Sequence, residues 1–222
     1  MRTRRWIPAA LVLYSAVPVA AGAIRVASLT GGVPELPDTD RFQAMPVPVL
    51  LHIVGASLFC VLGAFQFTGR QGRRHRVAGR LLVPLGLAGA LSALWLVLFL
   101  RHPAGDGALL AGFQIAASTG MAAALVLGLG AIRRRDVTRH RAWMIRGYAI
   151  AQGAGTQALI VAPVALTAGQ PTGVTRALLL GAGWAVNIAV AEWIIRRTGG
   201  TTHESDRAGS VRPAGRVAAG RG

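Results

Sequence analysis

The 222-residue sequence contains no lysine, one cysteine, eight acidic residues and 6% aromatic residues. The one thiol, Cys60, lies in an apolar run, so it can form neither an intramolecular disulfide nor a metal site of several thiols. The motifs GxxxxGK[ST], HExxH, CxxC and GxSxG are absent, and no apolar run holds paired carboxylates at catalytic spacing. We therefore expect a non-enzymatic protein in which Cys60 is a small packing residue.

Charged residues make up 14% of the chain and apolar residues 53%, with a mean hydropathy of +0.49. A soluble domain carries roughly 25% charged residues, so this composition excludes a water-soluble enzyme. The formal charge of +16 does not indicate a nucleic-acid partner. The arginines cluster in short segments between apolar runs instead of spreading among stacking aromatic residues.

Six apolar runs are each long enough to cross a bilayer, which takes about 20 residues. They lack strict alternation, and a spanning segment must satisfy its backbone internally, so we expect helices. The sequence predicts an all-α, polytopic transmembrane helix bundle over residues 1–197, followed by a disordered tail over 198–222. The predicted spans are Trp6–Leu29, Met45–Thr68, Leu81–Leu100, Ala108–Ile132, Ala142–Ala168 and Gly173–Ile195.

Arginine placement predicts the orientation of these six spans. Twenty of the 24 arginines lie before the first span, between spans two and three, around the gap between spans four and five, or after span six. The remaining four are Arg25, Arg41, Arg101 and Arg176. The positive-inside rule then places both termini in the cytoplasm of a bacterial cell, with the protein in the plasma (inner) membrane.

The N-terminus also resembles a signal peptide, because Arg2, Arg4 and Arg5 precede an apolar stretch that ends in Ala21-Gly22-Ala23. That stretch continues past Arg25 to Leu29, which is long for the apolar region of a signal peptide. We therefore favour an uncleaved first span, while cleavage would leave five spans with the same topology.

Two charged residues lie at matched depths near the cytoplasmic ends of spans five and six, Arg146 and Glu192. A charge inside a membrane costs roughly 2.5–3.5 kcal/mol on insertion scales, and pairing lowers that cost. We predict an intramembrane ion pair between them, with Arg196 at i+4 from Glu192 as the competing partner. The pair is interpreted as a structural pin between helices, and a proton or ligand relay is the functional alternative.

A second polar feature runs along span five. Tyr148, Gln152 and Thr156 recur at helical spacing and so share one face of the helix. Together with Gln66, Gln114 and Asn187 they are candidates for a polar seam between spans. The alternative is ordinary interhelical hydrogen bonding, at about 0.6 kcal/mol per bond.

Two Arg-His-Arg segments, 65 residues apart, each stand just before a predicted span. This similarity favours a duplicated unit of two helices. Clustered arginines at the inner membrane surface bind anionic lipid head groups, so we expect that role for these segments. The residues are Arg74, His75 and Arg76 in the first segment and Arg139, His140 and Arg141 in the second.

The string His140-Arg141-Ala142-Trp143-Met144-Ile145-Arg146 resembles the signature of a bacterial membrane-protein family, domain of unknown function 2306. The resemblance extends over roughly residues 46–165 and also rests on His52, Gly63, Gln66, Phe67, His75-Arg76 and Gly79-Arg80. Family members often carry a further arginine in span five, which the stretch Gly155-Thr156-Gln157-Ala158 lacks. The resemblance implies a membrane protein and no particular biochemical activity.

Three function classes follow from these residues. The first is a non-enzymatic partner, assembly or lipid-interacting subunit that uses its Arg-His-Arg segments. The second is a membrane redox protein with b-type haem or a quinone, whose candidate haem ligands are His52, His75 and His140. The third is a small-solute transporter with a path along Arg146, Glu192 and the polar face of span five. The expected kinks, at Pro84 and Pro163, lie away from the midplane and weigh against transport.

Overall fold

The computed structural model describes residues 6–36, 39–67, 72–103 and 105–210, the stretch 199–210 by its backbone alone. All regular secondary structure in this part of the chain is helical. Arg2, Arg4, Arg5, Asp38 and Arg70, as well as residues 211–222, fall outside it. In chain order the helices are α1 (Trp6–Leu29), α2 (Thr39–Gln43), α3 (Pro46–Gly63), the 3-10 helix η1 (Ala64–Phe67), α4 (Arg73–Phe99), α5 (Ala108–Arg133), α6 (Val137–Ala151), α7 (Gly153–Ala168) and α8 (Gly173–Ser210).

Six segments of the described chain are long and apolar enough to cross a membrane, which confirms the predicted six-span all-α architecture. They are α1, α3 with η1, α4, α5, α6 with α7, and α8 as far as Thr198. Large apolar side chains cover the outside of the bundle: Leu13, Phe99 and Leu166 are 76%, 69% and 87% exposed. Such surface is compatible with hydrocarbon around the bundle and not with water.

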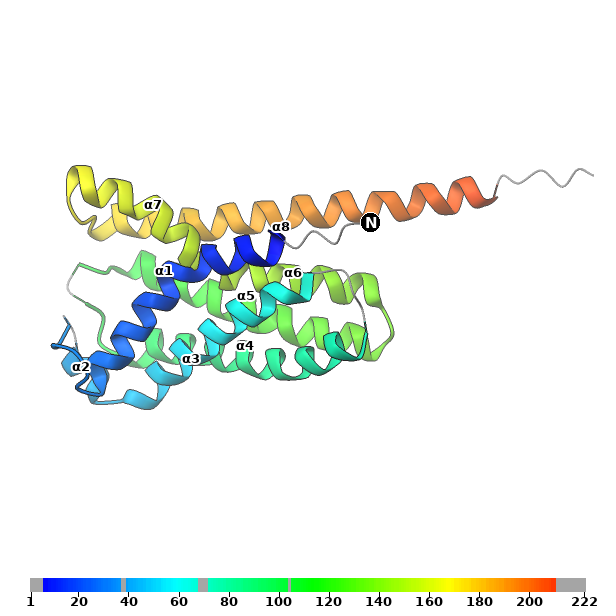
Figure 1. The fold of residues 1–222 in the computed structure, drawn as a ribbon. Helices are drawn as coiled ribbons and strands as arrows, with labels where there is room; N and C mark the ends of the chain where they lie inside the picture. The colour runs from blue at the N-terminus through cyan, green and yellow to red at the C-terminus, as the bar shows by residue number, and fades with distance from the viewer. Residues whose placement is uncertain (1–5, 37–38, 68–71, 104, 211–222) are drawn as a thin grey trace, which may run out of the picture.

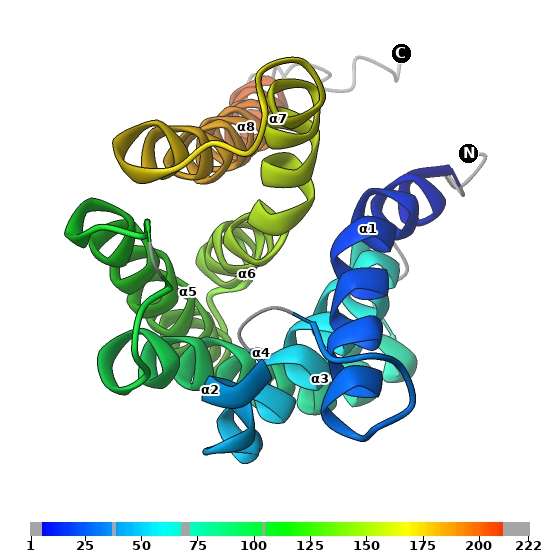
Figure 2. The same ribbon diagram turned by 90° about the vertical axis from the view of Figure 1, so that its left-hand side faces the viewer.

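Neighbouring helices pack as antiparallel hairpins, α3 with α4 and α5 with α6 (Figures 1 and 2). Helix α8 packs along α5, α6 and α7, while α1 packs on α3 and α7. The buried core lies where these helices meet and includes Phe59, Leu82, Met121, Leu125 and Tyr148. This packing brings polar residues of α1, α3, α6, α7 and α8 together inside the bundle.

The two ends of the bundle differ in charge. The first residues of α1, α4 and α6 lie at the end toward which α8 points its C-terminus (Figure 1). This end carries most of the arginines. Helix α2, the α4–α5 connection and the α7–α8 connection lie at the opposite end (Figure 1). The helices therefore alternate in direction as six spans require.

The described helices differ from the sequence expectation at two places. The fifth span is broken at Gln152, a position that the sequence analysis did not single out as a break, whereas α1, α4 and α7 continue through Pro18, Pro84 and Pro163. The backbone of residues 199–210, part of the segment 198–222 for which the sequence predicted disorder, continues α8 as a helix, and residues 211–222 lie outside the described chain.

Candidate functional site

Two Arg-His-Arg segments come together at the arginine-rich end of the bundle, at the N-termini of α4 and α6 (Figure 1). His75 and His140 lie close enough to interact electrostatically. The second segment is held in place locally: the Asp136 carboxylate accepts from the backbone N–H of Arg139 at 2.8 Å, capping α6. His140 Nδ1 donates to the carbonyl of Gly128 on α5 at 2.8 Å. We call these six residues the Arg-His-Arg surface: Arg74, His75, Arg76, Arg139, His140 and Arg141.

The four arginines of the Arg-His-Arg surface are exposed. The ion pairs found within the described ranges use other residues: Arg101 with Asp40, Arg146 with Glu192, and Arg176 with Asp106. The neighbouring acid, Asp136, is engaged at the α6 N-terminus. Positive charge is thus concentrated at one place and available to an external anion.

Arg146 and Glu192 form an ion pair between α6 and α8. Nε of Arg146 lies 2.6 Å from Oε1 of Glu192, and Nη2 lies 3.0 Å from Oε2, so the contact is bidentate. The guanidinium also lies 4.8 Å from the ring centre of Trp143. Glu192 is therefore joined to Arg146 and not to the alternative partner Arg196.

The break in the fifth span lies at Gln152, in the middle of the segment Val137–Ala168. Two backbone carbonyls beside the break are bound by side chains of neighbouring spans. Asn187 Nδ2 of α8 donates to the carbonyl of Ala149 at 3.0 Å, and the thiol of Cys60 on α3 donates to that of Ala151 at 3.5 Å. Irregular backbone at membrane depth is tolerated when such partners exist.

A hydrogen-bonded cluster surrounds the break. Gln152 Nε2 donates to the hydroxyl of Tyr148 at 2.7 Å, and Tyr148 donates to the carbonyl of Cys60 at 2.7 Å. Ser15 on α1 donates to Gln152 Oε1 at 3.0 Å. One turn further on, Thr156 donates to Asn187 Oδ1 at 2.6 Å. The cluster joins four spans, and its members Ser15, Tyr148, Gln152 and Thr156 are buried.

The predicted polar seam therefore differs in membership from this cluster. Four of the six predicted seam residues belong to the observed cluster: Tyr148, Gln152, Thr156 and Asn187. The other two, Gln66 and Gln114, take part in none of the hydrogen bonds found in the described part of the chain. Sequence reasoning missed Tyr14 and Ser15 of α1; Tyr14 hydrogen-bonds Thr156. The available signal was a Tyr-Ser pair in the middle of an otherwise apolar run.

The three candidate haem ligands lie in two separate places. His52 on α3 hydrogen-bonds through Nδ1 to the carbonyl of Gly89 on α4 at 2.9 Å. His75 precedes Gly89 by 14 residues on the same helix, about 21 Å at 1.5 Å per residue. One haem iron therefore cannot be bound by His52 together with His75, or by His52 together with His140, which lies close to His75. Within the described ranges, no group of three or more His, Cys, Asp and Glu residues is arranged to hold a metal ion.

Residues 49–195 match the family described as "Predicted membrane protein (DUF2306)". This match covers well over half of the sequence, so the chain belongs to that family. Searches of the curated proteins and of the solved structures found no match. The family description agrees with the six apolar spans.

Proposed function

We propose that this member of the DUF2306 family is a non-enzymatic membrane protein that binds anionic lipid head groups at its Arg-His-Arg surface. In this account it acts as a lipid-interacting or assembly subunit of the cytoplasmic leaflet of a bacterial plasma membrane. The observation that carries the proposal is the meeting of two basic segments, 65 residues apart in sequence, at one end of the bundle.

The attraction between the Arg-His-Arg surface and anionic lipids is electrostatic. A basic residue near an anionic membrane surface contributes about 1 kcal/mol of attraction, so four arginines supply on the order of 4 kcal/mol. Arginine is suited to phosphate because its planar guanidinium donates two parallel hydrogen bonds. The bond from His140 to Gly128 and the cap at Asp136 fix the α6 segment, which lowers the entropy lost on binding.

The test compares thermal unfolding of the purified protein in nanodiscs of phosphatidylcholine with nanodiscs that contain roughly 30% phosphatidylglycerol. A lipid that binds the folded state raises the unfolding temperature by mass action. We expect phosphatidylglycerol to stabilise the wild type by several degrees. The variant R74Q/R76Q/R139Q/R141Q loses most of that gain.

The matched control is R196Q/R197Q, which removes two exposed arginines from α8 at the same end of the bundle. Because it removes two arginines instead of four, and neither belongs to the Arg-His-Arg surface, it should lose less than half as much of the gain as the quadruple variant. Equal unfolding temperatures of the wild type in the two lipid mixtures would contradict the proposal. So would a quadruple variant that retains the full gain.

Transport of a small solute is the second candidate, and the break at Gln152 favours it. Secondary transporters bind their substrates at discontinuous helices near the bilayer midplane. The break also borders a cavity, since Ile150, Ala151 and Ala154 form part of its wall. A transporter must expose this place to each side in turn. We expect Ala154→Cys to react with impermeant thiol reagents from both sides if transport occurs, and from one side if it does not.

A further inference from the structure

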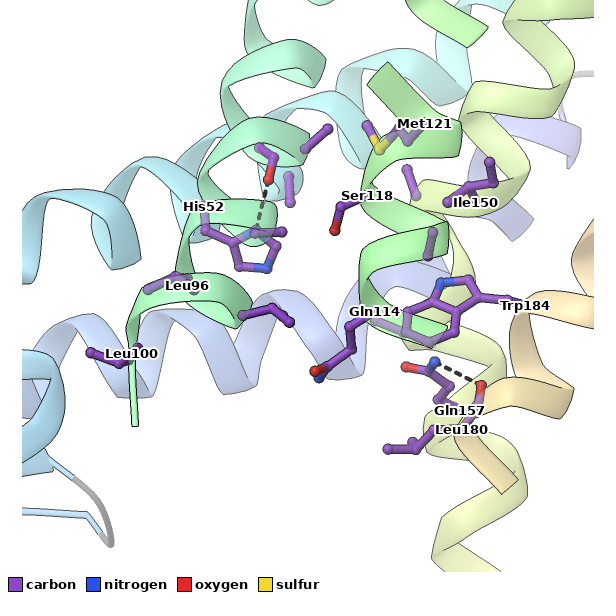
Figure 3. A pocket seen from close by; sticks show the side chains of 18 of the residues that line it. His52, Leu96, Leu100, Gln114, Ser118, Met121, Ile150, Gln157, Leu180 and Trp184 are labelled. Carbon is purple, nitrogen blue, oxygen red and sulfur yellow. Dashed lines mark hydrogen bonds between the residues drawn. The ribbon is translucent and has the colours of Figure 1, made fainter. Parts of the chain in front are cut away.

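A cavity of about 380 Å³ lies beside the break at Gln152, between α3, α4, α5, α6, α7 and α8, and α2 also contributes to its wall. Its charged wall residues, Arg41 and Asp106, lie at the end of the bundle that holds α2. Farther in, the wall consists of apolar side chains with a few uncharged polar ones (Figure 3). A charged ligand is costly to bury in such surroundings. The inner cavity therefore suits a neutral molecule.

His52 presents a hydrogen-bond acceptor to this cavity. The α3 and α4 backbones touch at two glycines, since a Cβ on Gly55 would lie 2.9 Å from the backbone nitrogen of Gly89. This contact brings the Gly89 carbonyl within reach of His52 Nδ1, at 2.9 Å. A carbonyl accepts only, so Nδ1 carries the proton, and a neutral imidazole then has a lone pair on Nε2. None of the hydrogen bonds within the described ranges uses Nε2.

Two further polar side chains on the wall have no hydrogen-bond partner within the described ranges: Gln114 and Ser118, one turn apart on α5. In Figure 3 they lie between His52 on one side of the cavity and Trp184 on the other. The indole of Trp184 and the thioether of Met121 supply surfaces that favour an aromatic ring. The cavity thus offers a hydrogen-bond acceptor on His52, donors and acceptors on Gln114 and Ser118, and a flat apolar surface on Trp184.

We propose that this cavity binds a lipid-soluble quinol, a neutral aromatic ring with two hydroxyl groups. One hydroxyl donates to Nε2 of His52, and the second meets Gln114 or Ser118. Trp184 and Met121 contact the ring, and the apolar wall accommodates its hydrocarbon substituents. The proposal concerns binding and is independent of the lipid head groups proposed for the Arg-His-Arg surface.

The test uses three forms of one probe: a 1,4-benzoquinol with a decyl tail, its dimethyl ether and its oxidised quinone. Binding to the detergent-solubilised full chain is measured anaerobically by calorimetry. The ether and the quinone retain the ring and the tail but cannot donate to His52. We expect the quinol to bind about tenfold more tightly than either, which corresponds to about 1.4 kcal/mol.

Protein variants locate the site. His52→Phe keeps an aromatic ring and removes the acceptor, so it should bind the quinol about tenfold more weakly and the ether unchanged. Ser118→Ala should weaken quinol binding less, because Gln114 remains. Thr119→Val is the matched control: this exposed neighbour donates to the carbonyl of Ile115 in its own helix. It should bind the quinol as the wild type does.

Two results would overturn the proposal: equal affinity of the wild type for the quinol and its ether, or a His52→Phe variant that binds the quinol normally. If His52→Phe fails to fold, the comparison of the three probe forms on the wild type decides alone. A single-hydroxyl lipid alcohol that binds as tightly as the quinol would also overturn it.

Discussion

Asn187 on α8 donates from Nδ2 to the carbonyl of Ala149, 3.0 Å away, one turn before the break in the fifth span. Its Oδ1 accepts from Thr156, one turn after Gln152. A single amide thus binds both halves of the broken helix. The break is a defined element of the fold with its own partner on α8, and is not a proline kink.

Asn187→Leu should destabilise the protein by about 1–3 kcal/mol, because it leaves the Ala149 carbonyl without its partner in an apolar setting. The measurement is thermal or denaturant unfolding of the purified protein in detergent. Thr119→Val, which removes a hydroxyl bonded within its own helix, serves as the control and should change stability by less than about 0.5 kcal/mol. An Asn187→Leu variant as stable as the wild type would show that Asn187 does not support the break.

Reversal of one charge in the Arg146–Glu192 pair should strongly reduce the yield of folded protein. Reversal places two like charges side by side at membrane depth, where an unpaired charge costs roughly 2.5–3.5 kcal/mol on insertion scales. Arg146→Glu or Glu192→Arg alone should lower the yield in detergent extracts, and the double reversal should restore it. Arg196→Glu should have a smaller effect because Arg146 holds Glu192. Failure of the double variant to recover would reject the pair as a structural pin.

Gly153→Ala should destabilise the junction between α6 and α7. A Cβ at this position would lie 2.3 Å from Nε1 of Trp184, closer than atoms pack, so the indole or the helix must move. Gly147→Ala is the matched control on α6, where the nearest side-chain atoms lie 3.4 Å and 3.5 Å away. We expect a lower unfolding temperature for Gly153→Ala and little change for Gly147→Ala. Equal effects of the two substitutions would argue against close packing at the break.

Protein purified from haem-replete cells should show no Soret absorption band. His52 contacts α4 at Gly89, about 21 Å along that helix from His75, so the two histidines cannot bind one haem iron. His75 and His140 lie close together, but beside exposed arginines. The measurement is an optical spectrum from 350 to 650 nm before and after reduction with dithionite. A Soret band that disappears in His140→Ala or His52→Ala would establish the redox alternative instead.

The number of spans and the alternation of arginine-rich ends followed from the sequence because both depend on composition along the chain. The Arg146–Glu192 contact could also be predicted, because two opposite charges at the same membrane depth lower their insertion cost by forming an ion pair. The break at Gln152 could not, because it depends on Asn187 and Cys60 from other spans, which take up the freed carbonyls. The cavity could not be predicted either, since its wall combines residues from seven helices that are far apart in the sequence.

The orientation of the arginine-rich end is the most direct test of the account, because an anionic lipid surface of the cytoplasmic leaflet must face it. In a Cys60→Ser background, Val137→Cys and Thr172→Cys place single thiols at exposed positions on opposite ends of the bundle. Intact expressing cells are treated with a membrane-impermeant maleimide. The account predicts that Thr172→Cys is labelled at once and Val137→Cys only after the cells are permeabilised. Labelling of Val137→Cys in intact cells would contradict it.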